Sequence, residues 1–262
     1  MESKNSDIRE TQDLFKWQYN CSHSKTYVGK CLIINNEEFN GQPEYRRKGT
    51  ERDGERLLRT FKKLRFDVEV KKNLKKDEMI RVLQDVSKEK HKEMGCFVCV
   101  FLTHGAPGAL YGSDLQTVPV RTLTSMLTAD RCPTLQNKPK LFIFQACRGL
   151  QYDSGIETDS EAESSDFVGT SDVPEMDFLC CYSTAPGYYS WRNPGTGSVF
   201  INELCEMLEK YHDLEIIQIL TRVSHQVATN FYSKTQNPNS DAKRQMPTIL
   251  STLTRELYLT AK

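Results

Sequence analysis

The chain has 262 residues, enough for one large α/β domain or two small ones that bury a core of their own. Its 35 Lys and Arg residues balance 35 Asp and Glu residues, so a formal net charge of zero argues against general nucleic-acid or membrane-surface binding. The longest apolar runs, 97–102 and 141–144, are too short to span a bilayer, and the charged N-terminus lacks a signal-peptide pattern. Nine cysteines, several within apolar runs, indicate buried free thiols and predict a cytoplasmic protein.

Short apolar runs alternate with amphipathic helical patterns along the first half of the chain. Strands are predicted at 31–34, 66–70, 96–102 and 141–144, and three of these are continuously apolar, as in a sheet covered on both faces. Helical spacing follows two N-capping candidates, Thr50 and Asp77. Further along come a strand at 178–183, helical patterns at 201–211 and 216–231, and a last strand at 248–254. This order predicts βαβ units in a mostly parallel sheet.

An acidic segment interrupts this pattern. Residues 149–191 contain neither Lys nor Arg, and acidic residues and serines crowd into their first part. Such a segment repels itself and stays solvated, which predicts a linker. Neither flanking part alone has enough strands and helices to cover both faces of a sheet, so we expect the linker to divide one sheet into two parts.

Two reactive side chains follow predicted strands. His104 and Gly105 come after the third apolar run, and Cys147 comes after the fourth. Because parallel strands end at the same edge of a sheet, we expect these residues to lie close together. A thiolate can attack a carbonyl while a nearby imidazole returns a proton to a leaving amine. The N–H groups of Gly105 and Cys147 could stabilise the oxyanion, so the pattern predicts acyl transfer.

The sequence around Cys147 resembles the nucleophile signature of caspases. The signature is Gln-Ala-Cys-Arg-Gly at 145–149, with a His upstream. The resemblance extends over nearly the whole chain; its further matches are 32–36, 47–50, 104–105, 182–193 and 245–247. It implies a caspase-like three-layer α/β fold, in which a central, mostly parallel six-stranded sheet carries helices on both faces. One chain would then supply a large and a small subunit.

The resemblance also implies a cysteine endopeptidase that cleaves after Asp, acts in apoptosis-type proteolysis and needs no cofactor. The pocket for the Asp carboxylate would consist of Arg47, Gln145 and Arg192. Two guanidinium groups can bind one carboxylate through several charge-assisted bonds, which predicts strong selectivity. By the same resemblance, the carbonyl of Tyr45 would orient His104.

The same resemblance implies further contacts with the substrate. Ser190 and Arg192 would pair with the substrate backbone as an added strand, and Tyr189 and Trp191 would line the neighbouring pockets. Asn193 favours an acidic residue four positions upstream of the cut, as in executioner members. Val199 stands where those members usually carry Trp and should enlarge this pocket, which leaves open the apolar or aromatic preference of inflammatory caspases.

The resemblance implies a precursor that is activated by cleavage in the linker. Ile-Glu-Thr-Asp-Ser at 156–160 resembles a site preferred by apical caspases, so the first expected cleavage follows Asp159, with Asp166 and Asp172 as further sites and Asp13 as an N-terminal one. The expected parts are a short pro-segment (1–26), a large subunit (27–159), a processing linker (160–176) and a small subunit (177–262). Two such large/small heterodimers would form a homodimer through the last strand, with protein substrates, an upstream activating caspase and inhibitor proteins as partners.

Other interpretations remain open or are disfavoured by particular residues. A catalytically silent caspase-like regulator would bind partners through the same groove, and the intact reactive residues argue against it. A metacaspase-like specificity for Lys or Arg would need acidic residues in place of Arg47 and Arg192. Cys96 and Cys99 have the spacing of half a zinc site but lie in an apolar strand, so no metal is expected.

Overall fold

A single mixed sheet forms the centre of the computed structural model, which describes residues 16–21, 27–149, 175–234, 236–239 and 241–260. The strand order is β11-β8-β7-β3-β1-β2. Strands β1, β2, β3, β7 and β8 are parallel to one another, and β11 is antiparallel to β8. The strands are β1 (Gly29–Asn35), β2 (Phe66–Lys72), β3 (Cys96–Leu102), β7 (Lys140–Gln145), β8 (Phe178–Tyr182) and β11 (Thr248–Ser251). The predicted six-stranded, mostly parallel sheet is therefore confirmed.

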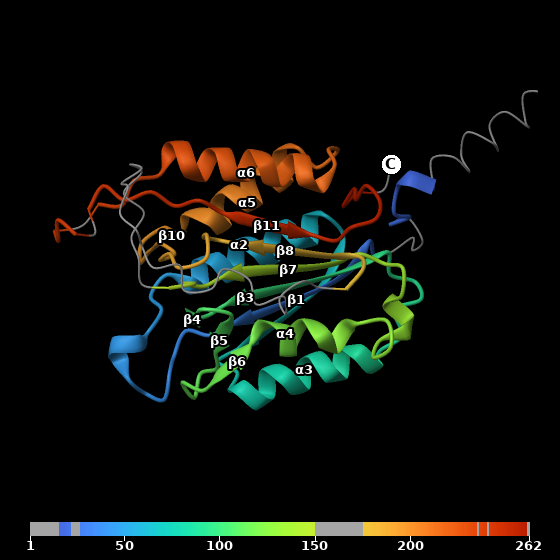
Figure 1. The fold of residues 1–262 in the computed structure, drawn as a ribbon, viewed down its shortest axis with the longest axis horizontal. Helices are drawn as coiled ribbons and strands as arrows, with labels where there is room; N and C mark the ends of the chain where they lie inside the picture. Colours follow the sequence, from blue (N-terminus) through green and yellow to red (C-terminus); the bar gives the residue numbers. More distant parts are fainter. Residues whose placement is uncertain (1–15, 22–26, 150–174, 235, 240, 261–262) are drawn as a thin grey trace, which may run out of the picture.

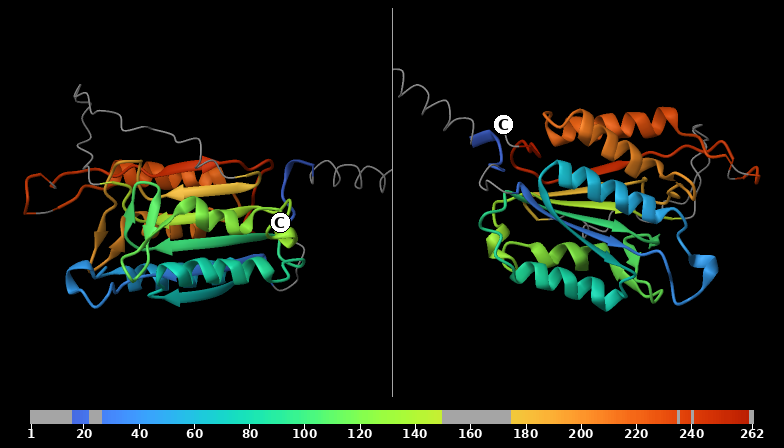
Figure 2. Two further views of the ribbon diagram at one scale, coloured as in Figure 1. Left: turned by 60° about the horizontal axis from the view of Figure 1, so that its bottom comes forward. Right: turned by 180° about the vertical axis from the view of Figure 1, so that it is seen from behind.

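Helices cover both faces of this sheet (Figure 1). One face carries α2 (Thr50–Lys63), α5 (Val199–Lys210) and α6 (Ile216–Asn230), and the other carries α3 (Lys76–Lys88) and α4 (Val120–Thr124). The right view of Figure 2 shows the same three layers from behind. No helix in the described ranges is long and apolar enough to cross a membrane.

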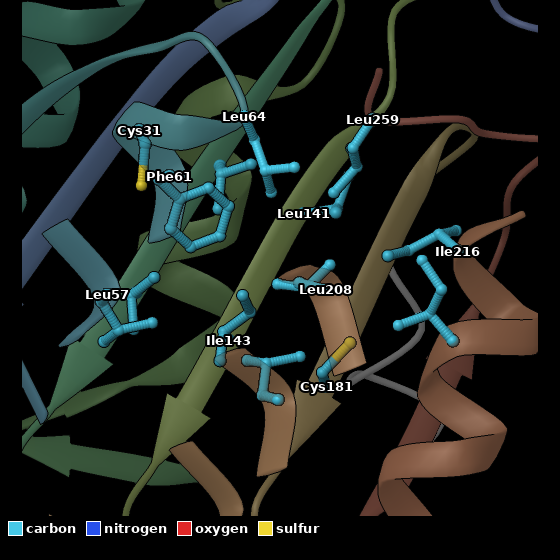
Figure 3. Packing of buried hydrophobic residues seen from close by; sticks show 14 of the residues in the cluster. Cys31, Leu57, Phe61, Leu64, Leu141, Ile143, Cys181, Leu208, Ile216 and Leu259 are labelled. Carbon is cyan, nitrogen blue, oxygen red and sulfur yellow. The ribbon is translucent and has the colours of Figure 1, made fainter. Parts of the chain in front are cut away.

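The two halves of the core follow from the alternation of side chains along each strand. Cys31 and Ile33 pack toward α2, α5 and α6, whereas Leu32 and Ile34 pack toward α3 and α4. Figure 3 shows part of the first cluster, in which Phe61 of α2 and Leu208 of α5 pack over the strands. Because both faces are covered, the central strands carry uninterrupted apolar runs at 31–34, 96–102 and 141–144, and their polar residues stand at the strand ends.

The two predicted helix caps, Thr50 and Asp77, were wrong by one and two residues. The N-cap of α2 is Gly49, whose φ of 89° suits glycine, and Thr50 is the first helical residue. The Thr50 hydroxyl instead donates to Asn35 Oδ1 at 2.7 Å. The N-cap of α3 is Lys75, whose backbone N–H donates to the Glu78 carboxylate at 2.8 Å. The last strand ends at Ser251 rather than at residue 254.

Two small sheets and an N-terminal segment have no counterpart among the predicted elements. One sheet has the order β4-β5-β6 and the other pairs β10 with β9; they are formed by β4 (Gly105–Ala106), β5 (Ala109–Tyr111), β6 (Thr117–Pro119), β9 (Arg192–Asn193) and β10 (Gly197–Ser198). The segment 16–21, within the expected pro-segment, packs against the C-terminal part: Tyr19 N–H donates to Glu256 O at 2.9 Å, and its hydroxyl donates to Asp177 at 2.6 Å. This segment therefore contributes to the folded unit.

Candidate active site

Strand register brings the loops that carry His104 and Cys147 together at one edge of the sheet. Leu102 of β3 pairs with Gln145 of β7, and each reactive residue lies two positions beyond its strand. The loops after β3 and β7 pack closely, because a Cβ on Gly105 would lie 2.2 Å from the Cys147 carbonyl oxygen. Only glycine fits at 105 without moving the backbone of the cysteine loop. The structure therefore brings together the three residues that the sequence assigns to catalysis.

His104 is oriented by a backbone carbonyl. Its Nε2 lies 2.7 Å from Tyr45 O, and its ring packs against Phe39 with centroids 4.7 Å apart. A carbonyl can only accept, so Nε2 carries the proton and Nδ1 is free to take one up. Burial lowers the pKa of His104 to about 4; the Tyr45 carbonyl opposes this shift, and the charges of Arg47 and Arg192 add to it. The imidazole is therefore neutral near pH 7.

Cys147 differs from the other cysteines in its exposure. All nine lie in the described ranges, and Cys147 alone is not buried. Its thiol donates to the Ser190 carbonyl over 3.9 Å. Partial burial of the thiol raises the pKa of Cys147. The bond to the Ser190 carbonyl and the charges of Arg47 and Arg192 oppose this shift. The free site thus holds a thiol and a neutral imidazole.

Arg47 of the predicted pocket is buried. It is 1% exposed, and its Nη1 donates to Asn36 O at 3.1 Å and to Thr50 Oγ1 at 2.7 Å. Its Nε has no hydrogen-bond partner among the described residues. Burial and the nearby charge of Arg192 lower the pKa of the Arg47 guanidinium. A buried cation with an unpaired donor is suited to bind an anion.

Arg192 and Gln145 complete the predicted pocket. Arg192 reaches from β9 across to the other part of the chain, where its Nε donates to Lys48 O at 3.0 Å. Burial lowers the pKa of Arg192, and Asp53 opposes this shift. Gln145 Nε2 donates to Ser190 Oγ at 2.8 Å, and its buried Oε1 has no partner in the described part of the chain. The structure thus brings residues from both sides of the linker to one site.

Aromatic side chains lie beside this pocket. The rings of Tyr189 and Trp191 meet edge to face, with centroids 5.1 Å apart, and Phe231 lies 6.3 Å from Trp191. The Trp191 backbone N–H donates to Gln245 Oε1 at 2.7 Å, while Gln245 Nε2 donates to Ser183 O at 2.7 Å. Gln245 therefore fixes the segment expected to pair with substrate, a role that its position in a short motif did not reveal.

The remaining predicted residues lie farther out. Asn193 is exposed, and its Oδ1 accepts from Gly195 N–H at 2.7 Å and from Thr196 N–H at 3.2 Å, so the side chain closes a turn. Val199 begins α5 and packs partly against the core. The predicted cleavage sites Asp13, Asp159, Asp166 and Asp172 lie outside the described residues. Within those residues, no group of three or more His, Cys, Asp or Glu side chains could hold a metal ion.

Sequence reasoning missed Asp53, Phe231 and the role of Gln245. Phe231 is the last residue of an apolar helical pattern, which predicts a core residue. Asp53 reads as an ordinary acidic residue in the first turn of a helix, where negative charge is favourable. Only their contacts with distant segments distinguish them.

Known proteins resemble this chain over most of its length. The caspase domain family model matches residues 28–258. Caspase-7 of Gallus gallus is 44% identical over 250 residues, which cover 92% of this chain and 80% of the relative. Caspase-3 of Mesocricetus auratus is 47% identical over 234 residues, covering 88% and 83%. The crystal structure of caspase-1 from Spodoptera frugiperda matches with a TM-score of 0.83 and 36% identity, covering 94% of this chain and 96% of that chain.

These matches agree with the site built from the residues. The family model spans both sides of the acidic segment, and the matched range includes His104 and Cys147 with the strands that position them. The chain belongs to the caspase family of cysteine endopeptidases.

Proposed function

We propose that this caspase cleaves proteins after Asp, and that Arg47, Arg192 and Gln145 bind the Asp carboxylate. One observation carries the assignment. Arg47 is buried, and neither it nor Arg192 makes an ion pair with any carboxylate of the described residues. Keeping a guanidinium in such a place is costly unless a bound anion offsets it. Rotation of the Gln145 amide would direct its NH2 group at the same carboxylate. Oε1 would then accept from Ser190 once that hydroxyl turns away from Ser183 Oγ, to which it donates at 2.8 Å in the free site.

In the proposed mechanism, Cys147 is the nucleophile and His104 is the general acid and base. As Sγ attacks the carbonyl carbon, the thiol proton passes to Nδ1 and the carbonyl π electrons move to oxygen. The N–H groups of Gly105 and Cys147 donate to that oxyanion. The imidazolium then protonates the leaving amine, the C–N bond breaks, and a thioester remains. Water attacks the thioester with His104 as base, and the acid product leaves a regenerated thiol.

Substrate selection beyond the Asp would use the segment 189–193. Ser190 and Arg192 would pair with an extended substrate backbone, and Tyr189 and Trp191 would contact its side chains. We assign an acidic preference to the residue four positions upstream of the cut. Val199 leaves more room there than Trp would, so an apolar or aromatic preference is the competing outcome of a substrate screen.

Processing and assembly complete the proposal. Cleavage after Asp159, with Asp166, Asp172 and Asp13 as further sites, would convert a precursor to the active form in the cytoplasm. The pairing of β7 with β8 and the contacts of α2 with α5 support this, because they hold the two parts together without a covalent link. The outer edge of β11 is a sheet edge at which a second copy could pair to form the homodimer.

The test is the intact mass of the purified wild type beside Cys147→Ala after incubation in reducing buffer. Fragments ending at the linker aspartates in the wild type alone, with turnover of a peptide ending in Asp, support the proposal. If both proteins stay whole, an apical caspase is added to cut the linker. Lack of turnover after that cut would instead favour a catalytically silent regulator.

A further inference from the structure

The two arginines of the proposed pocket come from segments on opposite sides of the acidic linker. Arg47 precedes α2, and Arg192 lies in β9. Beyond the bond from Arg192 to Lys48 O, these segments also meet at Gly49, where a Cβ would lie 2.6 Å from Asn193 O. The distance between the two guanidinium groups therefore depends on how α2 is attached to the 192–198 hairpin.

Asp53 makes that attachment. It is fully buried in the first turn of α2, where its Oδ1 accepts from Ser198 N–H at 2.7 Å and its Oδ2 accepts from the Ser198 hydroxyl at 2.5 Å. Gly197 allows the close approach, because a Cβ there would lie 2.3 Å from Asp53 Oδ1 and the residue has a φ of 85°. Both carboxylate oxygens are thus bound by one residue of the other part of the chain.

Contacts link each arginine to the first turn of α2. Ser198 pairs with Arg192 across the β9–β10 ladder, so a fixed Ser198 fixes the backbone of Arg192. On the other side, Arg47 Nη1 donates to the hydroxyl of Thr50, the first residue of the same helix. The first turn of α2 therefore holds the Arg47 guanidinium through Thr50 and the backbone of Arg192 through Asp53 and Ser198.

We propose that Asp53 is a positioning residue for the acid pocket, which sets the spacing of Arg47 and Arg192 and thereby the preference for Asp over Glu. The inference rests on the proposed function, because it concerns the same pocket. Asp53 makes no ion pair with either arginine among the described residues, so its hydrogen bonds to Ser198 carry the role.

A purely electrostatic role for Asp53 would have the opposite sign. Its negative charge repels a substrate carboxylate bound nearby, so loss of the charge alone would lower KM. Loss of positioning would raise KM and weaken the discrimination between Asp and Glu. Asp53→Asn separates the two, because an amide can still accept from Ser198 N–H and donate to the Ser198 hydroxyl without the charge.

The experiment compares linker-cleaved wild type with Asp53→Ala, Asp53→Asn and Ser198→Ala. For each we would measure the melting temperature and the kcat and KM on two tetrapeptides that end in Asp or in Glu. The matched control is Thr60→Ala. Thr60 is also buried in α2 and donates to Glu209 of α5 at 2.6 Å, but it lies about 10 Å further along the helix from Asp53.

We expect Asp53→Ala to raise KM for the Asp peptide about tenfold or more, to change kcat less than about threefold, and to reduce the ratio of kcat/KM for Asp over Glu. Asp53→Asn should stay within about threefold of wild type in KM, in kcat and in the Asp/Glu ratio. Thr60→Ala should lower the melting temperature and leave KM and the ratio unchanged. Should Asp53→Ala fail to fold, Ser198→Ala provides the same test. It removes the hydroxyl bond to Asp53 Oδ2 and keeps the bond from the backbone N–H of residue 198 to Asp53 Oδ1.

Three outcomes would overturn the positioning role. In the first, the variants at 53 and 198 lower the melting temperature but leave KM and the Asp/Glu ratio unchanged, as Thr60→Ala should. In the second, Asp53→Asn is as impaired as Asp53→Ala. In the third, Asp53→Asn lowers KM, which assigns the effect to charge. Wild type that cleaves no Asp peptide would overturn the proposed function as well, so the two failures are distinguishable.

Discussion

The proposed pocket should distinguish a carboxylate from its uncharged isostere. Replacing the Asp of a substrate by Asn preserves the shape of the side chain but removes its charge. Arg47 would then stay 1% exposed without an anion, and its Nε would face an amide that offers one acceptor instead of two. The penalty combines lost bonds with an uncompensated buried cation.

The size of this penalty follows from the donors present. Arg47 Nε and at least one donor of Arg192 would lose a charge-assisted bond, and each such bond contributes about 1.5–3 kcal/mol. Two of them correspond to a decrease of about 10²–10⁴-fold in kcat/KM. Arg47 is buried whereas Arg192 is partly exposed and screened by solvent, which places the expected loss near the middle of that range, about 10³-fold.

The assay uses two fluorogenic tetrapeptides that differ only in Asp or Asn before the cleaved bond. The wild type, Arg192→Met and Arg59→Met would be compared after cleavage of the linker. Arg192→Met removes one cation of the pocket, so the Asp/Asn ratio of kcat/KM should fall at least tenfold. Arg59 is exposed on α2 and serves as the matched control, whose substitution should not change the ratio.

Two results would refute this reasoning. A wild-type ratio below about ten would mean that neither guanidinium contributes a charge-assisted bond. Equal effects of Arg192→Met and Arg59→Met would mean that the positive charge acts at long range rather than within the pocket.

Three further predictions concern other parts of the molecule. Tyr19→Phe removes a donor to Asp177, which is 3% exposed, so the free energy of unfolding should fall by about 1–3 kcal/mol, and an unchanged melting temperature in calorimetry would contradict this. Burial disfavours both charged forms of the proposed catalytic pair, raising the pKa of Cys147 and lowering that of His104 to about 4. Between pH 6 and 8 the 240 nm absorbance of free wild type and Cys147→Ser should therefore coincide, whereas a thiolate signal would show an ion pair. Gly105→Ala should lower kcat about 10²-fold or more, because its Cβ would displace the Cys147 carbonyl; peptide turnover near wild type would exclude this clash.

Much of the fold could be predicted because the central strands are buried on both faces. Burial favours an uninterrupted apolar run along all of β3 and through the middle of β1 and β7, and that signal is local and visible in the sequence. Parallel strands end at one edge, so the approach of His104 to Cys147 also followed from strand order. The predicted caps failed because Gly49 and Lys75 begin their helices without a side-chain cap, and the residues that were chosen stand inside them.

The sequence by itself determined the layered parallel sheet, the reactive pair at its edge and the resemblance to caspases. Only the tertiary structure decided that Arg47 is buried, that Gln245 holds Trp191, and that Asp53 binds Ser198. The physical reason is distance along the chain. Apolar periodicity reports the environment of neighbouring residues, whereas the Asp53–Ser198 contact joins positions 145 residues apart and exists only once the sheet has brought α2 and the β9–β10 hairpin together.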